Sequence, residues 1–408
     1  LLQTLQQNLL DEMAVRLDQE SYWHWANPIL RAGGVWFDDV MAEGADTALD
    51  STTESSPSRE GEYSGTNNQE SGVDEADFLK TDGFHTYMLN GQLLLIMGIP
   101  EFGQINLLST MQIEGNPMSM MIEGDTMVVA SSIYGWQLEE GHPLIPILAK
   151  EYTYPNSDYV YKHYRSNLVK YSIIDISDRN SPSIQHELYL EGNYNTARLV
   201  DGTVRSITHA QMDVWGLEYY VTLPDEYWSI EDVYERMDVW NSSLLQTLSD
   251  NRDRILMLTL EDLLPQRYVM DGDSIITLPY SVNECNEYAA SSDSVARGFL
   301  SITTFDISND YVSMEVDHIA SSWAHVYASP DALVFAEPAN DWWWFWGNDG
   351  MTEATNIHSF DISNPGDTLY TGSGRVNGTV LNQFSVSEYE WSSKCHIIRS
   401  IPNAGSTT

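Results

Sequence analysis

The stretch that decides the fold, residues 171–202, reads "YSIIDISDRNSPSIQHELYLEGNYNTARLVDG". It contains an apolar strand that ends in Asp-Ile-Ser, a polar turn, a second apolar strand and the first half of a hairpin. The hairpin tip is Asp-Gly, and these two residues tolerate the backbone angles that join twisted antiparallel strands. The stretch therefore predicts consecutive β-strands joined by tight turns.

Both elements of this stretch recur along the chain. The hairpin form occurs five times, at residues 78–89, 119–130, 197–208, 267–278 and 326–337. The Asp-Ile-Ser form occurs three times, headed by Asp175, Asp306 and Asp361, whose short carboxylates can accept backbone N–H groups in a turn. A hairpin, a strand ending in Asp-Ile-Ser and a closing strand make a unit of four strands. Repeated units of this kind predict the blades of a β-propeller and fit a sandwich less well.

Residues 66–83, which read "TNNQESGVDEADFLKTDG", resemble the entry motif of a known family. It comprises secreted bacterial and archaeal proteins with a C-terminal β-propeller that is distantly related to WD-40 repeats. The matching positions are Thr66, Asn67, Gln69, Gly72, Val73, Asp74, Glu75, Ala76, Asp77, Lys80, Asp82 and Gly83. The likeness continues in residues 171–202, 294–308 and 372–390. It implies a secreted or envelope-anchored propeller, often a lipoprotein, and brings no catalytic residue with it.

The predicted fold class is all-β, a propeller of six or more four-stranded blades in the full protein, expected to be incomplete in this chain, with an N-terminal helix and a helical insertion. The predicted divisions are an N-terminal helical segment (1–41), an acidic disordered linker (42–72), a propeller with five blades and the start of a sixth (73–390) and an atypical tail (391–408). The linker is rich in Ser, Thr, Glu, Gly and Asn and has almost nothing to bury.

Two segments have the apolar spacing of helices. In residues 1–20 the spaced residues are Leu2, Leu5, Leu9, Met13 and Leu17. In residues 229–250 they are Ile230, Val233, Tyr234, Met237 and Trp240. Ser229 is the predicted cap of the second helix, with Asp232 in the position of a capping-box acid.

The tail after Glu390 contains no acid, unlike the rest of the chain. We expect a truncation or a change of reading frame there, and a short basic tail is the alternative.

The two cysteines, Cys285 and Cys395, form no CxxC pair, which excludes zinc-ribbon and thioredoxin-type sites. Whether these cysteines pair with each other stays open.

The charge of the chain is strongly negative, with 60 Asp and Glu against 19 Lys and Arg and a net charge of -41. Such a field repels nucleic acid and anionic lipid, so we exclude both as partners, and it attracts divalent cations. An acidic solvated surface is the simpler interpretation. The sequence has no apolar run of about 18 residues, so no membrane span is predicted.

The acids Asp74, Glu75 and Asp77 form a candidate Ca²⁺ site, because a hard cation prefers oxygen ligands. The EF-hand order of acids is absent. The favoured interpretation is structural: these carboxylates accept backbone N–H groups and pair with Lys80 where the first blade begins.

An aromatic run is the candidate partner-binding site, and it consists of Trp342, Trp343, Trp344, Phe345 and Trp346. Asn, Asp and Gly bound it, which suggests an exposed hairpin tip that binds a protein, a sugar or a membrane interface. Packing over a neighbouring blade is the alternative. Insertions at 133–167 and 205–265 are further candidate binding loops. The ten histidines are scattered and form no HExxH motif.

These observations favour a non-enzymatic, extracytoplasmic scaffold that binds a protein or a surface polysaccharide through its loops. The alternatives are a hydrolase or lyase that acts on an extracellular polymer with acids at the propeller channel, and a calcium-stabilised structural module. No catalytic residue is assigned, because no G-x-S-x-G elbow occurs and carboxylate pairs are uninformative in so acidic a chain.

Overall fold

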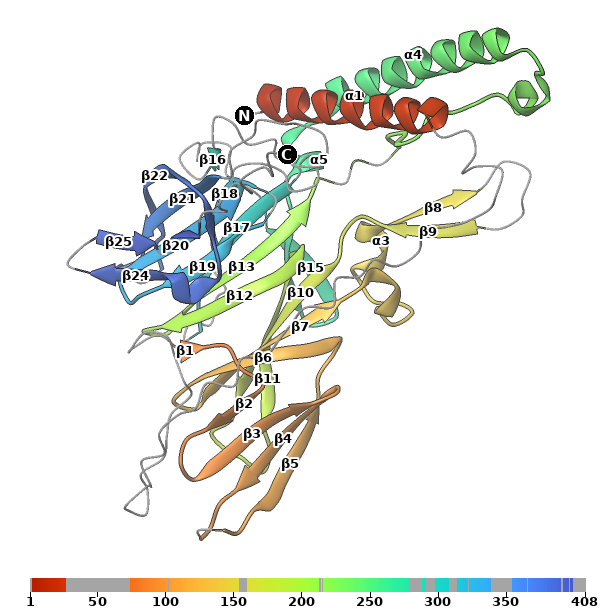
Figure 1. Ribbon diagram of the computed structural model, residues 1–408. Coiled ribbons are helices and arrows are strands. Elements are labelled where there is room, and N and C mark those ends of the chain that lie inside the picture. Colours follow the sequence, from red (N-terminus) through yellow and green to blue (C-terminus); the bar gives the residue numbers. More distant parts are fainter. Residues whose placement is uncertain are drawn as a thin grey trace, which may run out of the picture. The chain divides into compact units, whose positions relative to one another are not determined.

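The computed structural model falls into two compact units (Figure 1). The helical unit comprises Leu1–Glu62 and Val214–Asp262, and the β unit comprises Tyr63–Asp213 and Leu263–Thr408. The structure describes residues 2–26, 74–101, 103–153, 160–212, 214, 216–278, 288–290, 298–307, 314–321, 323–338, 354–364, 366–389, 392–395 and 397–398.

The β unit is built from antiparallel quartets of strands that follow one another along the chain (Figure 1). The first quartet contains β2 (Leu79–Thr81), β3 (His85–Asn90), β4 (Leu93–Gly98) and β5 (Asn106–Gln112). The second contains β6 (Asn116–Glu123), β7 (Thr126–Ile133), β10 (Leu168–Asp175) and β11 (Ser183–Glu191). The third contains β12 (Asn193–Val200), β13 (Thr203–Gln211), β17 (Gly298–Asp306) and β18 (Met314–Ala320). The fourth contains β19 (His325–Ala328), β20 (Ala332–Pro338), β21 (Ala354–Asp361) and β22 (Leu369–Asn377).

Apolar residues join each quartet face to face with the next. Tyr87 and Ile96 of the first quartet share a buried cluster with Met120 and Ile174 of the second. The second and third quartets share a cluster that includes Tyr171, Leu188, Val204 and Phe305, and the third and fourth share one that includes Ile207, Ile302, Phe335 and Phe360. The second and third quartets are therefore covered on both faces, which explains the seven consecutive buried residues of β10.

This succession of quartets confirms the predicted all-β architecture with an N-terminal helix. A sandwich would place two sheets around one core, with one face of each sheet in water. Here separate clusters lie between successive pairs of quartets, so one repeated packing arrangement builds the β unit.

One of the five predicted hairpins has a different role from the others. Four of them open a quartet, but β14 (Arg267–Asp271) and β15 (Ser274–Leu278) do not, so the prediction that this hairpin opens a unit is wrong. It lies in the insertion between β13 and β17, and β14 pairs with β11, which places Tyr268 opposite Tyr189. The turn residues determine that a hairpin forms, but not which strand it joins.

The Asp-Ile-Ser segments make one backbone bond in every quartet that contains them. The isoleucine N–H donates to the carbonyl oxygen of the residue just before the second strand of its own quartet. The three bonds are Ile176 to Asp125 (2.8 Å), Ile307 to Gly202 (3.0 Å) and Ile362 to Asp331 (2.9 Å). All three isoleucines are buried, so the motif anchors the strand that carries it to the hairpin.

The acids that head these segments cap the turn, as predicted for Asp175 and Asp361. Their carboxylates accept the backbone N–H of Ser177 (2.8 Å) and Ser363 (2.9 Å) respectively. These hydrogen bonds hold the pKa of both carboxyl groups below the usual range, since each stabilises the charged form.

Shorter strands complete the β unit. β1 (Asp74–Glu75) pairs with β12, and β16 (Tyr288–Ala290) pairs in parallel with β18. Three further two-stranded pairs are β8 (Ala149–Thr153) with β9 (Val160–Tyr164), β23 (Thr379–Val380) with β26 (Ile397–Ile398), and β24 (Val386–Tyr389) with β25 (Ser392–Cys395). The predicted boundary at Glu390 lies between β24 and β25, so strand pairing continues into the predicted tail. The predicted linker and Cys285 lie outside the described residues.

The helical unit pairs α1 (Leu2–Ala26) with α4 (Val233–Met257), and it also contains η2 (Asp225–Ser229) and α5 (Leu260–Leu263). The predicted stripe of α1 is confirmed, because Leu5, Leu9, Met13 and Leu17 are at most 2% exposed. The His24 ring stacks on Trp240 at 3.8 Å, and the Trp240 indole N–H donates to Ser21 Oγ at 2.9 Å. None of the described helices is apolar enough over a sufficient length to cross a membrane.

The predicted start of α4 is wrong, and of its predicted stripe only Trp240 is among the buried residues of the helix. The cap is Asp232, whose carboxylate accepts the Glu235 N–H at 2.9 Å, while Ser229 ends η2. Val233, Tyr234 and Met237 are exposed, and the buried residues are Trp240, Thr247, Asn251 and Ile255. The polar members of this set are buried because they bond to the backbone of residues 218–222, which apolar spacing does not reveal.

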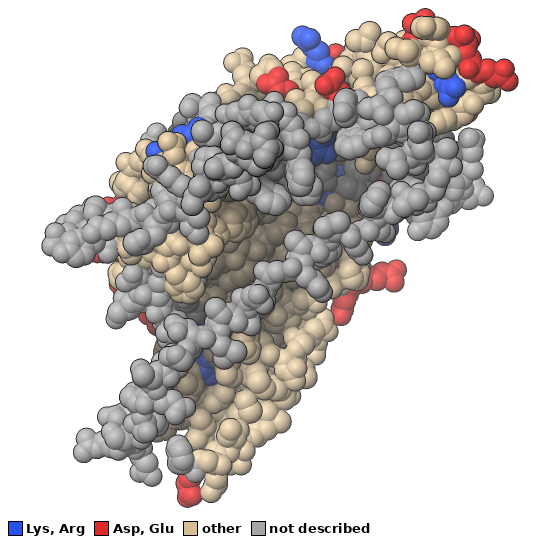
Figure 2. Space-filling view, in the orientation of Figure 1, with Lys and Arg blue, Asp and Glu red and all other residues tan. Residues whose placement is uncertain are grey.

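Acidic side chains line the solvent face of α4. Exposed acids there are Glu235, Asp238, Asp250 and Asp253. Figure 2 shows acidic side chains in red at the surface of the helical unit. Part of the negative charge of the chain is thus solvated surface, as the simpler interpretation of the composition expected.

Candidate functional site

A compact insertion, residues 134–148, covers one end of the second quartet and contains η1 (Gly135–Gln137) and α3 (Ile145–Leu148). It belongs to the connection from β7 to β10. Three buried leucines anchor it, Leu138, Leu144 and Leu148, and they share a cluster with Leu168 and Tyr189 of the quartet. The insertion is therefore packed against the sheet through an apolar face.

The turn at the start of this insertion is held tightly. Gly135 is buried against the Tyr164 ring, and a Cβ at this position would lie 2.2 Å from that ring. Gln137 Oε1 accepts the Tyr134 N–H at 2.9 Å and Asn116 Nδ2 at 3.3 Å. These contacts fix the two residues on either side of Gly135.

Those two residues, Tyr134 and Trp136, form an exposed aromatic surface that we call the aromatic platform. Their side chains are 42% and 72% exposed. Their ring centroids lie 5.9 Å apart with only 9° between the planes. The exposed acids Glu139 and Glu140 follow closely in the sequence. An exposed pair of stacked aromatic rings is a surface suited to binding.

Beneath the insertion lies a cluster around Lys170 of β10, whose side chain is only 3% exposed. Its ammonium lies 2.7 Å from Glu114 Oε2 and also pairs with Glu187. The Tyr189 hydroxyl donates to Glu114 at 2.9 Å, and the Lys170 ammonium lies 5.3 Å from the centre of the Tyr189 ring. His142 of the insertion lies 3.7 Å from Glu114, so the cluster ties the insertion to the sheet.

The pKa shifts in this cluster describe a stable ion pair. Burial alone would raise the pKa of Glu114, but the hydrogen bonds from Lys170 and Tyr189 outweigh it and hold that pKa below the usual range. Burial lowers the pKa of His142 and raises that of the Tyr189 hydroxyl. The Lys170 ammonium is thus engaged by two carboxylates, and the cluster positions the insertion rather than supplying a nucleophile.

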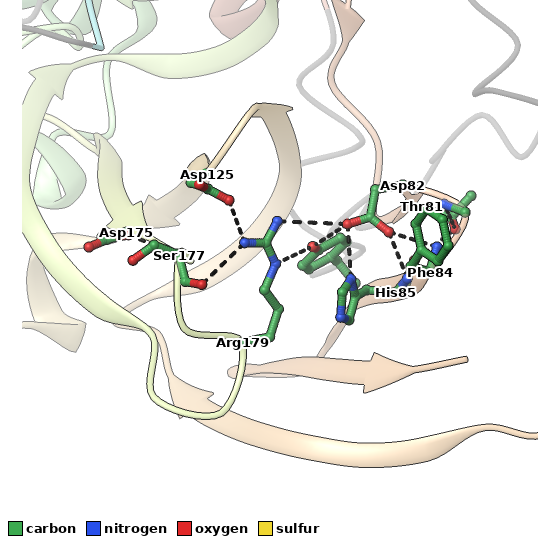
Figure 3. A network of polar contacts seen from close by, with 10 residues as sticks. Thr81, Asp82, Phe84, His85, Asp125, Asp175, Ser177 and Arg179 are labelled. Carbon is green, nitrogen blue, oxygen red and sulfur yellow. Dashed lines mark hydrogen bonds and ion pairs between the residues drawn. The ribbon is translucent and has the colours of Figure 1, made fainter. Parts of the chain in front are cut away.

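A second polar network joins the first and second quartets (Figure 3). Asp82 accepts the backbone N–H groups of Phe84 (2.9 Å) and His85 (2.6 Å), and its other oxygen accepts the Tyr87 hydroxyl (2.9 Å). Arg179, in the loop after the Asp-Ile-Ser segment, donates to the Tyr87 hydroxyl at 3.1 Å and pairs with Asp125. Its own carbonyl oxygen accepts Ser109 Oγ at 2.7 Å. The loop of the second quartet is therefore docked on the first.

The predicted Ca²⁺ residues lie on a segment that contacts two quartets through its backbone. Asp74 pairs with Leu199 in the β1–β12 ladder, and Asp77 exchanges two backbone bonds with Met120 at 3.1 and 2.7 Å. The Asp77 carboxylate accepts the Phe78 N–H at 2.7 Å. The side chains of Asp74 and Glu75 are outside those described, so Ca²⁺ binding stays a prediction. Among the described residues, no three His, Cys, Asp or Glu side chains are arranged to hold a metal ion.

The predicted aromatic run, residues 342–346, lies outside the described residues. The aromatic platform lies at the edge of the predicted 133–167 insertion, although its two residues were not singled out from the sequence. The sequence does contain a pattern that indicates them, because two aromatic residues flank a glycine directly after a strand in the segment "YGWQLEEG" (134–141). The Lys170 cluster had no such signal, because its members come from four distant segments.

Comparison with models of protein families matches residues 63–391 to the family described as the beta propeller domain. The matched range covers most of the 408 residues and includes all of the quartets described above. A search of curated proteins finds no match to the chain.

Proposed function

The chain belongs to the beta propeller domain family, and on this premise we propose that it is a non-enzymatic scaffold that binds its partner through the aromatic platform. Propeller folds commonly present loops at the ends of their blades for binding. The partner is a segment of another protein or a surface polysaccharide.

The observation that supports this proposal is that the Trp136 side chain is exposed on a turn whose position is fixed by its contacts. An indole that is 72% exposed on a turn fixed by buried glycine and amide contacts has no role in the core of the quartet. Aromatic side chains on rigid turns lose little conformational entropy when a partner covers them. The platform therefore suits a binding surface.

The chemistry around the platform favours a partner with positive charge. Glu139 and Glu140, which follow Trp136 closely in the sequence, are exposed, and the chain carries a net charge of -41. A lysine, an arginine or a protonated amino sugar could place its cation over the Trp136 ring and its charge near these carboxylates. An anionic partner would be repelled at the same place.

The proposal is tested by measuring the binding of two cationic probes to the purified protein, a lysine-containing peptide and a chitosan oligosaccharide. Biolayer interferometry at moderate salt limits the contribution of nonspecific attraction. We expect Trp136→Ala to weaken at least one probe by about tenfold or more, as for an aromatic residue at the centre of an interface.

The matched control is Trp228→Ala, which removes an indole that is 65% exposed in the helical unit. It retains the net charge and should bind as the unchanged protein does. Equal affinity of the Trp136→Ala and Trp228→Ala variants for both probes would exclude the platform as the contact surface. Weaker binding of the peptide alone would indicate a protein partner, and weaker binding of the chitosan oligosaccharide alone would indicate a polysaccharide.

We further propose an extracytoplasmic location for this scaffold, which the resemblance of residues 66–83 to secreted proteins supports. Fractionation of cells that express the full-length gene, followed by immunodetection, tests this. Detection only in the cytoplasmic fraction would contradict it.

A further inference from the structure

The junction between the third and fourth quartets is held by a buried arginine. Arg205 of β13 is 1% exposed, and its Nη2 donates to the carbonyl oxygens of Ile362, Asn364 and Asp367, each at 3.1 Å. Ile362 belongs to the Asp-Ile-Ser segment of the fourth quartet, Asn364 and Asp367 follow it, and with Thr368 we call these residues the docking loop. One guanidinium thus holds three points of this loop.

Side chains of the third quartet form a polar row opposite the docking loop. The sheet register places Arg205 opposite Thr304, and Thr304 opposite Glu315 of β18. Thr304 Oγ1 lies 2.9 Å from Thr368 Oγ1 of the docking loop. The next carboxylate on the same face of β18 is Asp317, opposite Ile302. Arginine and both acids therefore face the loop together.

Three carboxyl groups meet at this row with one arginine to balance them. Asp317 is buried, Glu315 is half-buried and hydrogen-bonds to the Asp367 carboxyl group of the docking loop. One oxygen of Glu315 and one of Asp317 are buried without a hydrogen-bond partner among the described residues. The charged groups that face the acids are Arg205 from β13 and Asp367 from the loop, while Arg267 of β14 donates to the Met314 carbonyl at the start of β18.

Burial and mutual repulsion raise the pKa of both β18 acids. The pKa of Glu315 rises to about 8, first through burial and then through the charges of Asp317 and Asp367. The pKa of Asp317 rises to about 7, through burial and the charge of Asp367. These groups therefore lose their protons near neutral pH, far above the usual range of carboxyl groups.

We propose that this junction is a pH-sensitive lock, in which protonated Glu315 and Asp317 hold the docking loop and their ionisation releases it. In the protonated state a carboxyl hydrogen bond links Glu315 to Asp367. When both protons pass to solvent, three negative charges face the cation of Arg205, and Asp367 is repelled from β18. The loop then leaves the sheet, and the acids become hydrated.

The direction of the pH dependence follows from proton binding. The closed junction holds protons that the open junction releases, so its stability is complete below the ordinary carboxyl values of 3.8 and 4.5 and is lost as the pH rises to about 8. Above that pH both states are ionised and the stability of the junction changes no further.

Hydrogen exchange on the full chain tests the lock. Mass spectrometry of the peptide 362–368 at pH 6 and pH 9, corrected for intrinsic exchange rates, reports opening of the docking loop. We expect its protection to fall by about tenfold or more between these values, since each unit of pKa shift corresponds to a tenfold change. The peptide 176–182, which carries Arg179 at the first junction, is the internal reference and should keep its protection.

The variant E315Q/D317N removes both ionisations and should keep the peptide 362–368 protected at pH 9. The matched control D271N/D273N neutralises two exposed acids of the β14–β15 turn and should show the same loss as the unchanged chain. Loss of protection at both junctions, no loss at either, or an undiminished loss in E315Q/D317N would overturn the proposal. If that variant does not fold, E315Q alone should at least reduce the loss, and an unchanged loss again overturns the proposal.

Discussion

Arg179 and Arg205 dock equivalent loops from opposite sides. Arg179 belongs to a loop and reaches the sheet of the preceding quartet, whereas Arg205 belongs to a sheet and reaches the loop of the following quartet. Arg179 donates from Nε to Tyr87 and from Nη1 to Asp125, which a lysine cannot reproduce from a single nitrogen, whereas the three bonds of Arg205 all come from Nη2. The junction of the first and second quartets therefore depends on the shape of the arginine head group as well as on its charge.

This dependence predicts that Arg179→Lys destabilises the β unit although the charge is kept. We expect a loss of about 1–3 kcal/mol in the free energy of unfolding, because the bonds to Tyr87 and Asp125 cannot both be made. Urea denaturation followed by circular dichroism measures it. Arg252→Lys, on the exposed face of α4, should change little. A lysine variant as stable as the unchanged protein would show that charge alone suffices.

At the scale of elements, the turn at Gly135 links the fold to the proposed function. Its glycine is required by the close approach of Tyr164, and not by an unusual backbone angle. The same close packing exposes the side chains before and after it. A shift in the backbone of this turn should therefore also change how Tyr134 and Trp136 contact a partner.

Gly135→Ala should accordingly reduce both stability and probe binding. A Cβ only 2.2 Å from the Tyr164 ring forces the turn or the ring to move, at a cost of about 1–3 kcal/mol. Thermal melting and the probe assay measure the two effects. Gly374→Ala, where nothing lies within 4 Å of the added Cβ, is the matched control. Our account of the turn fails if the two alanine variants melt alike and bind alike.

Elements were predicted where local chemistry determines them. Tight-turn residues located five of the hairpins, including β14–β15, and the leucine spacing located α1. The neighbour of β14 and the buried face of α4 were not predictable, because distant segments determine both. The same holds for the candidate site. The insertion was predicted from the sequence, but the environment of Lys170 was not, because it depends on Glu114, Glu187 and His142, which only the fold brings together.

At the scale of the whole molecule, the junctions of the β unit differ in their response to pH. The first junction contains Asp82, whose pKa is held low by hydrogen bonds that outweigh the effect of burial. The junction between the third and fourth quartets contains acids with raised pKa values. Junctions between quartets of the same architecture should therefore respond to pH in opposite directions.

The first junction should consequently open in acid. Stability from a lowered carboxyl pKa is present above the ordinary value and is lost as the pH falls through the lowered one. Hydrogen exchange of peptide 82–87 should show reduced protection at pH 3 relative to pH 6, while peptide 362–368 stays protected. Asp82→Asn should weaken this acid response. Equal loss of protection in both peptides at pH 3 would argue for global unfolding instead.

The pairing of α1 with α4 has a consequence for biosynthesis. Leu17 and Trp240 share one cluster but are 223 residues apart in the chain (240 minus 17). At about 5–20 residues per second, a ribosome needs roughly 10–45 s to make the intervening chain. During that time the leucine stripe of the nascent helix has no α4 to cover it, so this part of the helical unit can complete its core only after α4 emerges.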